Sequence, residues 1–377
     1  MSYDFLYRSK DEMSYLINGV EFNSMLEFEL FSHEVLSKYL KDHGVISELV
    51  KNKAFTYEIM FIKWASGTVF EDFIEFFFNN LRGALKSHKD DLISLYIEYD
   101  LKVHNALVNY QDAASIASKA SFEHKRTKVT AMFTSFGHII ESSLYPQLNL
   151  IYGILKLSKE SSLYNPDNKG RDFTGGRLVQ DLISSSAVVE GVLKGLLMDV
   201  PLSQWRNISN HGSYKYNKES DSIICYYGDK NKYSITLKYD DLFVLGKSID
   251  MIQILLKTCL ELSTCDLRID EKTNIEYENY ELTVESILSQ IGNVLAIFSY
   301  ELVNMEKESS NWKINIKDIN SLGVDRFQEL GNEIAIYFLL MYKIHRISME
   351  LEVFDCNGET FQKLSLRKTN EIDELLL

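Results

Sequence analysis

The sequence predicts a mainly α-helical protein. Apolar residues recur at three- and four-residue spacings in most long segments, which indicates amphipathic helices. Alternating apolar residues, typical of strands, occur mainly in residues 223–239 and 349–366. With 377 residues, 45% of them hydrophobic, the chain is long enough for two or three domains with apolar cores. We expect a helical N-terminal region (1–118), a central helical bundle with a β-hairpin insertion (119–265) and a small α+β region (266–377).

The N-terminal region is expected to be helical because its aromatic residues share the spacing of one helix face. Acidic residues separate them, as on a helix with one buried and one solvated side. This spacing favours a core stripe over a ligand-binding site. The stripe consists of Phe70, Phe73, Ile74, Phe77 and Phe78.

The central region is expected to contain two long helices, at about 122–158 and 174–198, separated by the loop-forming residues 165–170. Asp199-Val200-Pro201 interrupts the second pattern, and a short helix can restart there because proline is tolerated in a first turn. The second long helix has the clearest apolar stripe in the chain. Its members are Leu178, Leu182, Val189, Leu193 and Leu196.

A β-hairpin is expected after the short helix. Ile223–Tyr227 and Tyr233–Tyr239 flank the turn residues 228–232, and apolar residues alternate in the second run. Asp240 or Asp241 can then cap another helix, which runs to about Cys259. Two long helices, a short one and a closing helix predict a bundle, with the hairpin as an insertion.

The C-terminal region mixes helical and strand patterns and is predicted to form an α+β unit. It contains no catalytic motif, and its acidity suggests a role in dimerisation, sensing or inhibitor binding. The expected elements are helices at 282–303 and 327–345, a strand at 312–316, and a hairpin whose strands, 349–353 and 361–366, flank Asn357-Gly358.

The sequence predicts a cytoplasmic protein that does not bind membranes. Residues 1–12 are too charged for a signal peptide, and no uncharged apolar run reaches the roughly 18 residues of a membrane span. The four cysteines, Cys225, Cys259, Cys265 and Cys356, form neither a CxxC pair nor a close cluster with histidine. We therefore expect reduced thiols, no metal site and no cofactor.

The net charge of −14 at first argues against a nucleic-acid partner, but its distribution favours one. Residues 1–118 hold 11 Lys and Arg against 18 Asp and Glu, which is −7, and residues 266–377 hold 11 against 21, which is −10. Residues 119–265 hold 18 against 15, which is +3. The central region alone is basic, so we expect nucleic acid to bind there.

The octapeptide Trp205–Gly212 contains the residues that point to a chemistry. Arg206 and His211 are separated by four residues, and Asn207 follows the arginine. A guanidinium offers a rigid fork of donors to a phosphate, and an imidazole moves protons near neutral pH. Together these groups meet the needs of RNA transesterification without a metal.

The short helix is expected to end at this motif, because Gly212 follows the histidine. Arg206 and His211 then lie about 140° apart around the helix axis, whereas Asn207 and His211 share a face. We therefore expect Asn207 to orient the imidazole, while the long arginine side chain reaches around. A second match, Arg82-x5-His88, lies in a charged helical stretch and is interpreted as a solvated helix face that matches by chance.

Arg206-Asn207-x3-His211 resembles the Arg-x4-6-His motif of the HEPN superfamily, in which Asn, Asp or His commonly follows the arginine and the motif follows a long helix. The resemblance extends over 121–265, about 145 residues. It implies a helical bundle and a metal-independent endoribonuclease that acts as a homodimer, in toxin–antitoxin, abortive-infection, CRISPR or other antiphage defence systems. In small HEPN toxins a tyrosine stands two residues after the histidine, but here that position is Ser213 and Tyr214 comes next.

The mechanism that these residues predict is cleavage by the RNA 2′-hydroxyl. His211 would transfer protons, Arg206 would stabilise the charge on the phosphate, and Asn207 would hold the imidazole or a phosphate oxygen. The products would be 2′,3′-cyclic phosphate and 5′-hydroxyl ends. The expected partners are RNA, a second copy of the chain and an antitoxin or regulatory protein. Residues predicted to contact RNA are Lys194, Lys215, Lys218 and Tyr214, with Lys230, Lys232 and Lys238 as further flanking lysines.

Two other interpretations of the motif stay open. The chain can be a non-catalytic HEPN-type adaptor that binds RNA or another protein, or the motif can be a coincidence that stabilises a helix junction. Toxicity that depends on His211 would distinguish a nuclease from an adaptor.

Overall fold

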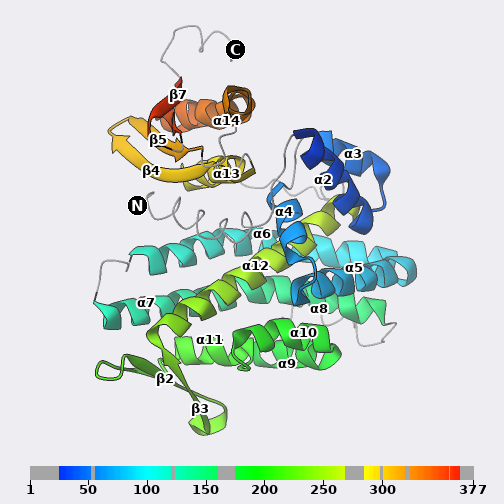
Figure 1. The fold of residues 1–377 in the computed structure, drawn as a ribbon. Coiled ribbons are helices and arrows are strands. Elements are labelled where there is room, and N and C mark those ends of the chain that lie inside the picture. Colours follow the sequence, from blue (N-terminus) through cyan, green and yellow to red (C-terminus); the bar gives the residue numbers. More distant parts are fainter. Residues whose placement is uncertain are drawn as a thin grey trace. The chain divides into compact units, whose positions relative to one another are not determined.

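The computed structural model describes residues 25–51, 56–119, 124–159, 175–267, 284–297, 300–318, 323–355 and 357–365. This part of the chain is mainly helical and contains two small sheets (Figure 1), which confirms the predicted mainly α class. The chain divides into two compact units, one of residues 32–275 and one of residues 1–31 with 276–377. In the described residues, no helix has the length and apolar character needed to cross a membrane.

The larger unit is a bundle of helices around a continuous apolar core. Helix α8 packs against α5 and α6, α7 packs against α6 and α11, and α12 crosses several of them (Figure 1). Its described elements, including the helix α2 that continues across its boundary, are α2 (Met25–Tyr39), α3 (His43–Lys51), α4 (Thr56–Ala65), α5 (Val69–Ser87), α6 (Lys89–Lys119), α7 (Lys125–His138), the π-helical turn η1 (Ile139–Leu144), α8 (Tyr145–Ser158), α9 (Gly175–Ser185), α10 (Ala187–Leu193), the 3-10 turn η3 (Gly195–Leu197), α11 (Leu202–Asn210), β1 (Tyr214–Asn217), β2 (Ser222–Tyr227), the 3-10 turn η4 (Asp229–Asn231), β3 (Tyr233–Lys238) and α12 (Tyr239–Leu267).

The aromatic stripe predicted in the N-terminal region forms the buried face of α5. All five of its side chains are buried, and Thr68 begins the helix by accepting a hydrogen bond from the Phe70 amide at 3.2 Å. Helices α6 and α7, on either side of the boundary predicted near residue 118, pack against each other. That predicted boundary therefore lies inside one compact unit, whereas the one near 265 is close to the division at 275–276.

The helix predicted at 122–158 contains a π-helical turn that the sequence pattern did not indicate. Residues 125–158 are continuously helical, but η1 interrupts the α-helical hydrogen bonding between α7 and α8. A buried polar network holds this turn against α12: Ser143 Oγ and Gln147 Nε2 both donate to Gln253 Oε1, each at 2.9 Å. Glu141, which lies in the same turn, is thereby fixed relative to the bundle.

The prediction of a single helix at 174–198 is wrong, because the structure divides this segment at Ser186. The extended backbone of Ser186 ends α9, and its hydroxyl caps α10 by accepting from the Val188 amide at 3.2 Å. Met198 and Asp199 then adopt left-handed backbone angles, with φ of 57° and 59°. A short helix, α11, restarts there as the sequence predicted, but Pro201 caps it and does not lie in its first turn.

The predicted hairpin is confirmed as strands β2 and β3, and β1 adds a third antiparallel strand that the sequence analysis missed. β1 has only four residues, too few for a recognisable alternation. The Asp241 carboxylate accepts a hydrogen bond from the Lys238 amide at 2.8 Å, so it helps to begin α12, in line with the expected cap.

The smaller unit contains a four-stranded sheet in the order β4-β5-β6-β7. The helix predicted to reach Val303 ends at Ile297, because Leu302 and Met305 are buried in strand pairing with β5. Gly358, with φ of 86°, stands in the predicted turn between the last two strands. The elements are α13 (Val284–Ile297), β4 (Glu301–Glu308), β5 (Asn311–Lys317), α14 (Gly323–His345), β6 (Ser348–Phe354) and β7 (Thr360–Ser365).

Candidate functional site

The motif that contains Arg206 and His211 lies at the C-terminal end of α11. His211 follows the last helical residue, and Gly212 adopts a left-handed conformation with φ of 61°. The Ser213 amide donates to the Ile208 carbonyl at 2.9 Å, and the Gly212 amide donates to the Ser209 carbonyl at 3.4 Å. These two bonds form a Schellman motif, so the glycine ends the helix as the sequence predicted.

Two contacts fix α11 within the bundle. The Trp205 side chain is fully buried, and its Nε1 donates to the Leu197 carbonyl at 3.0 Å. At the other end of the helix, Gly137 of α7 faces Asn210, and a Cβ added at Gly137 would lie 2.2 Å from Asn210 Oδ1. Because such a distance is too short for any side chain, glycine at this position lets α7 and α11 approach closely.

Glu141 binds the guanidinium of Arg206 through both carboxylate oxygens. Arg206 Nη2 lies 2.7 Å from Glu141 Oε1, and Arg206 Nε lies 3.2 Å from Glu141 Oε2. Asn210 Nδ2 donates to the same carboxylate. The hydrogen bonds from Arg206 hold the pKa of Glu141 below its usual range, so this carboxylate is ionised at neutral pH. The planar guanidinium is thus held in one orientation.

The sequence analysis missed Glu141, although a signal for it existed. Glu141 is the only Asp, Glu, Lys or Arg between Val129 and Leu155. A single carboxylate in an otherwise uncharged helical segment needs a partner if it is even partly desolvated. That argument could have suggested pairing with a distant arginine, but it could not have chosen Arg206.

Arg206 keeps donors for a further ligand. Its Nη1 donates to Asn207 Oδ1 at 3.3 Å, so described residues accept from three of its N–H groups. A guanidinium has five such groups, so two remain. The side chain is 28% exposed, which leaves part of it open to solvent.

The side chains of Asn207 and His211 are not joined in this structure. The Asn207 amide contacts Arg206, and the expected contact with the imidazole is not formed. His211 is exposed, and its ring makes no hydrogen bond with any described residue. Among the described residues, therefore, none fixes the orientation of the imidazole by a hydrogen bond.

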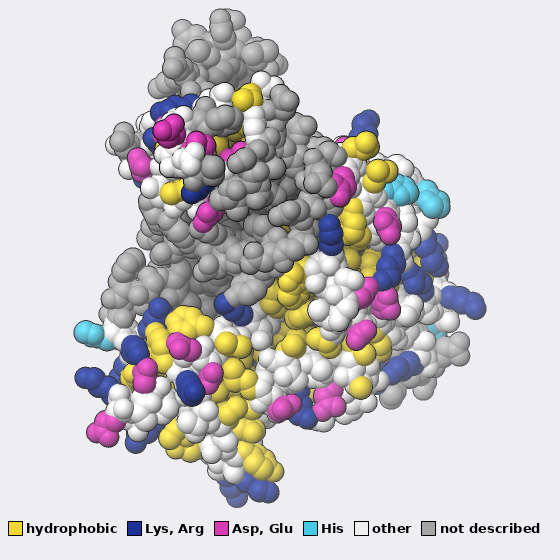
Figure 2. Space-filling model, in the orientation of Figure 1, with side chains coloured by type: hydrophobic (Ala, Val, Ile, Leu, Met, Phe, Trp, Pro, Cys, Tyr) yellow, Lys and Arg dark blue, Asp and Glu magenta, His cyan; other side chains and the backbone are white. Residues whose placement is uncertain are grey.

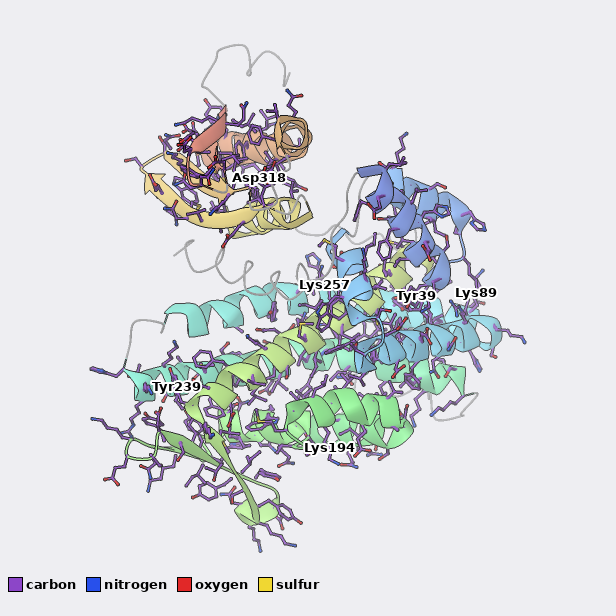
Figure 3. All side chains as sticks on the ribbon, viewed as in Figure 1. Tyr39, Lys89, Lys194, Tyr239, Lys257 and Asp318 are labelled. Carbon is purple, nitrogen blue, oxygen red and sulfur yellow. The ribbon has the colours of Figure 1, made fainter. Side chains whose placement is uncertain are left out.

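Of the four residues predicted to contact RNA, two are exposed lysines, and the other two contact other side chains of the protein. Lys215 and Lys218 are exposed and form no ion pair with a described carboxylate. Lys194 pairs with Glu190 at 2.7 Å, and it lies far from Tyr239 at the sheet side of the unit (Figure 3). The Tyr214 ring stacks on Phe133 of α7, with 4.1 Å between ring centroids, so this ring packs against the bundle.

The second match to the motif, Arg82 and His88, serves the packing of helices. Arg82 Nη2 donates to the Lys38 carbonyl at 2.9 Å and thereby ties α5 to the end of α2. His88 ends α5, and its ring lies 3.6 Å from the Asp91 carboxylate. These contacts favour a structural role for this match.

Comparisons of the chain with protein-family models, with curated proteins and with solved structures found no match.

Proposed function

We propose that this protein is a metal-independent endoribonuclease of the HEPN type, with Arg206 and His211 as catalytic residues. The observation that carries the proposal is the held guanidinium of Arg206, which keeps two donors available and lies five residues before an exposed imidazole at the end of the same helix. A pre-oriented arginine binds a phosphate with little loss of side-chain entropy. The basic central region supports an anionic partner.

The proposed reaction breaks the bond between phosphorus and the 5′-oxygen. A base removes the proton of the RNA 2′-hydroxyl, and the 2′-oxygen attacks phosphorus to form a 2′,3′-cyclic phosphate. The 5′-oxygen leaves with a proton from an acid. His211 performs this proton transfer, and Arg206 stabilises the charge on the non-bridging oxygens. Asn207 supports Arg206 or a phosphate oxygen.

We propose further that the active form is a homodimer in the cytoplasm. One step needs a base and another needs an acid, and a single His211 can supply only one of them at a time. Two copies of the motif over one phosphate would supply both. A toxin or antiphage effector, restrained by an antitoxin or regulatory protein, is the biological role that this activity fits.

The test is incubation of purified protein with total RNA in excess EDTA, followed by mapping of the new ends. The variants are Arg206→Ala, His211→Ala and the matched control His88→Ala from the second motif. We expect cyclic-phosphate and 5′-hydroxyl ends with wild type and His88→Ala only. Equal cleavage by all four proteins, or hydrolytic 3′-hydroxyl ends, would contradict the proposal.

One observation favours a second function, a non-catalytic adaptor. The Arg206–Glu141 ion pair links α11 to η1, which is what a structural arginine would do. An adaptor predicts no RNA cleavage, no toxicity on expression and a lower melting temperature for Arg206→Ala. A nuclease predicts toxicity that is lost in His211→Ala while the melting temperature is unchanged.

A further inference from the structure

The sheet formed by β1, β2 and β3 has two chemically different faces. Paired residues of neighbouring strands point to the same side, so the pairing Lys215–Ile224–Thr236 places these three on one face. The opposite face carries Ile223, Cys225 and Leu237, which are buried against the bundle. The face that includes Lys215 is called the outer face here, and it consists of Ser213, Lys215, Asn217, Ser222, Ile224, Tyr226, Ser234, Thr236 and Lys238.

The outer face is open to solvent. Lys215, Thr236 and Lys238 are exposed, and Tyr226 in the central strand is 37% exposed. The Tyr226 ring lies near the end of this strand and makes no ring contact with a described residue, so it offers a flat apolar surface. This arrangement is typical of sheets on which unpaired bases stack.

The outer face attracts anions. It contains no aspartate or glutamate, and neither Lys215 nor Lys238 forms an ion pair with a described residue. The neighbouring lysines Lys218 and Lys230 likewise form no ion pair within the described part of the chain. In Figure 2, lysine and arginine side chains lie at the lower left, where aspartate and glutamate side chains are interspersed among them, and at the bottom of the view. Lys215 and Lys238 therefore share the outer face with Tyr226, opposite Ile224 and Ser222 of its strand.

The outer face adjoins the motif through Ser213. The Tyr226 amide donates to the Ser213 carbonyl at 2.8 Å, so Tyr226 stands opposite a residue that follows His211 by two positions. Two residues of extended chain span at most about 7 Å, which keeps the outer face next to the imidazole. A ligand that reaches Arg206 can therefore continue onto the sheet.

We propose that the outer face binds single-stranded RNA next to the cleaved phosphate, with one base stacked on Tyr226 and phosphates contacted by Lys215 and Lys238. The position relative to cleavage rests on the proposed function, whereas the binding of single-stranded RNA does not. Base pairs hide the base faces, so duplex RNA cannot stack on Tyr226. The sheet therefore selects unpaired RNA, and it favours no base by hydrogen bonding.

The experiment measures binding of a fluorescein-labelled, unstructured RNA by anisotropy, with full-length protein that carries His211→Ala to prevent cleavage. Tyr226→Ala should raise Kd about tenfold, and Tyr226→Phe should leave it nearly unchanged, because the ring is kept. Tyr233→Ala, at an exposed tyrosine on the other face of the sheet, is the matched control and should also leave Kd unchanged. The same RNA as a duplex should bind more weakly and should not respond to Tyr226→Ala.

The lysines are tested by salt dependence. Lys215→Gln with Lys238→Gln should lower the slope of log Kd against log salt by about 1.4, as expected for two single-strand phosphate contacts. Lys86→Gln with Lys89→Gln removes the same charge at the α5–α6 turn, and Lys89 lies far from the sheet (Figure 3), so the slope should stay unchanged.

Equal Kd values for Tyr226→Ala and Tyr233→Ala would overturn the proposal, as would duplex RNA that binds as tightly as single-stranded RNA. Binding that depends on Tyr226 in a protein without cleavage activity would support the outer face and refute only the nuclease. Cleavage that depends on His211 but is unaffected by Tyr226→Ala and by the lysine substitutions would refute only the outer face.

Discussion

Glu141 places a negative charge beside Arg206, although it is not part of the Arg-x4-His motif. Its carboxylate orients the guanidinium of Arg206 and also accepts from Asn210 on the same helix. Since this carboxylate joins η1 to two residues of α11, the position of the guanidinium depends on a residue 65 positions earlier in the chain. Glu141 is therefore a positioning residue for the proposed phosphate contact.

Glu141→Gln should lower RNA cleavage at least tenfold, because a neutral amide holds Arg206 less firmly and offers one acceptor oxygen in place of two. We expect the loss in kcat rather than in KM, since the arginine acts on the charge that develops in the transition state. Glu190→Gln, which breaks the exposed pair with Lys194, is the control and should cleave like wild type. A purely structural Glu141 would lower the melting temperature without this kcat effect.

The same pair makes a small contribution to stability that depends on pH. The pKa of Glu141 is lowered in the folded protein, mainly by hydrogen bonds from Arg206, so the contribution is present above the ordinary carboxyl pKa and is lost as pH falls through the lowered value. Glu141 is 48% exposed, so we expect at most about 1 kcal/mol. The melting temperatures of wild type and Glu141→Gln should therefore differ above about pH 5 and converge in more acidic buffer. A constant difference would show that the pair does not cause it.

At the scale of elements, the site depends on the close packing of α7, η1 and α11. Gly137 and Glu141 are four residues apart, and both face the last turn of α11. Gly137 allows the approach, and Glu141 then bonds the two side chains that the approach brings near. Gln253 of α12 fixes the π-helical turn by hydrogen bonds. The Glu141 carboxylate in that turn is therefore positioned by α12 and in addition by its own bonds to α11.

Gly137→Ala should destabilise the protein by about 1–3 kcal/mol, because the new methyl group would overlap Asn210 and contact Ser209 Cβ at 3.1 Å. It should also lower RNA cleavage by moving Arg206 away from Glu141. Gly176→Ala is the control, since an added Cβ in α9 meets nothing within 4 Å and alanine favours a helix. Thermal unfolding and cleavage rates measure both effects. Identical behaviour of the two variants would contradict this role of Gly137.

At the scale of the whole molecule, charge is divided between the parts of the chain. Residues 119–265 carry +3 and contain the motif and the three-stranded sheet, whereas residues 266–377 carry −10. RNA should therefore be attracted to residues 119–265, and the acidic region should limit non-specific adsorption. The proposed homodimer would place two such basic regions around one RNA.

Mixing wild type with a large excess of His211→Ala should lower cleavage by more than dilution does, if two protomers contribute to one site. A mixed dimer holds a single His211, which supplies the base or the acid but not both. Most wild-type protomers stand in mixed dimers after equilibration, so cleavage per wild-type protomer should fall well below that of wild type alone. Unchanged cleavage per wild-type protomer would show that each protomer acts alone, if mass spectrometry confirms that the mixed dimers formed.

The sequence by itself determined the local features of this protein. The spacing of Phe70, Phe73 and Phe77 predicted a buried helix face, and Asn357-Gly358 predicted a hairpin, because such patterns depend on neighbours along the chain. The end of α11 at Gly212 was predictable for the same reason. These features need no knowledge of distant residues.

Only the tertiary structure decided which residues meet. The pairing of Glu141 with Arg206 joins positions 65 residues apart, and no local pattern encodes such a contact. Packing likewise decided that the predicted 174–198 helix divides at Ser186. Strand pairing decided that Val303 lies in a strand and not in a helix. Both outweigh weak local preferences. The residues of the outer face likewise follow only from the pairing of β1, β2 and β3, which places exposed and buried residues on opposite sides of the sheet. Burial and long-range electrostatics act between chain segments, and that is why the folded arrangement, not the sequence pattern, defines the site.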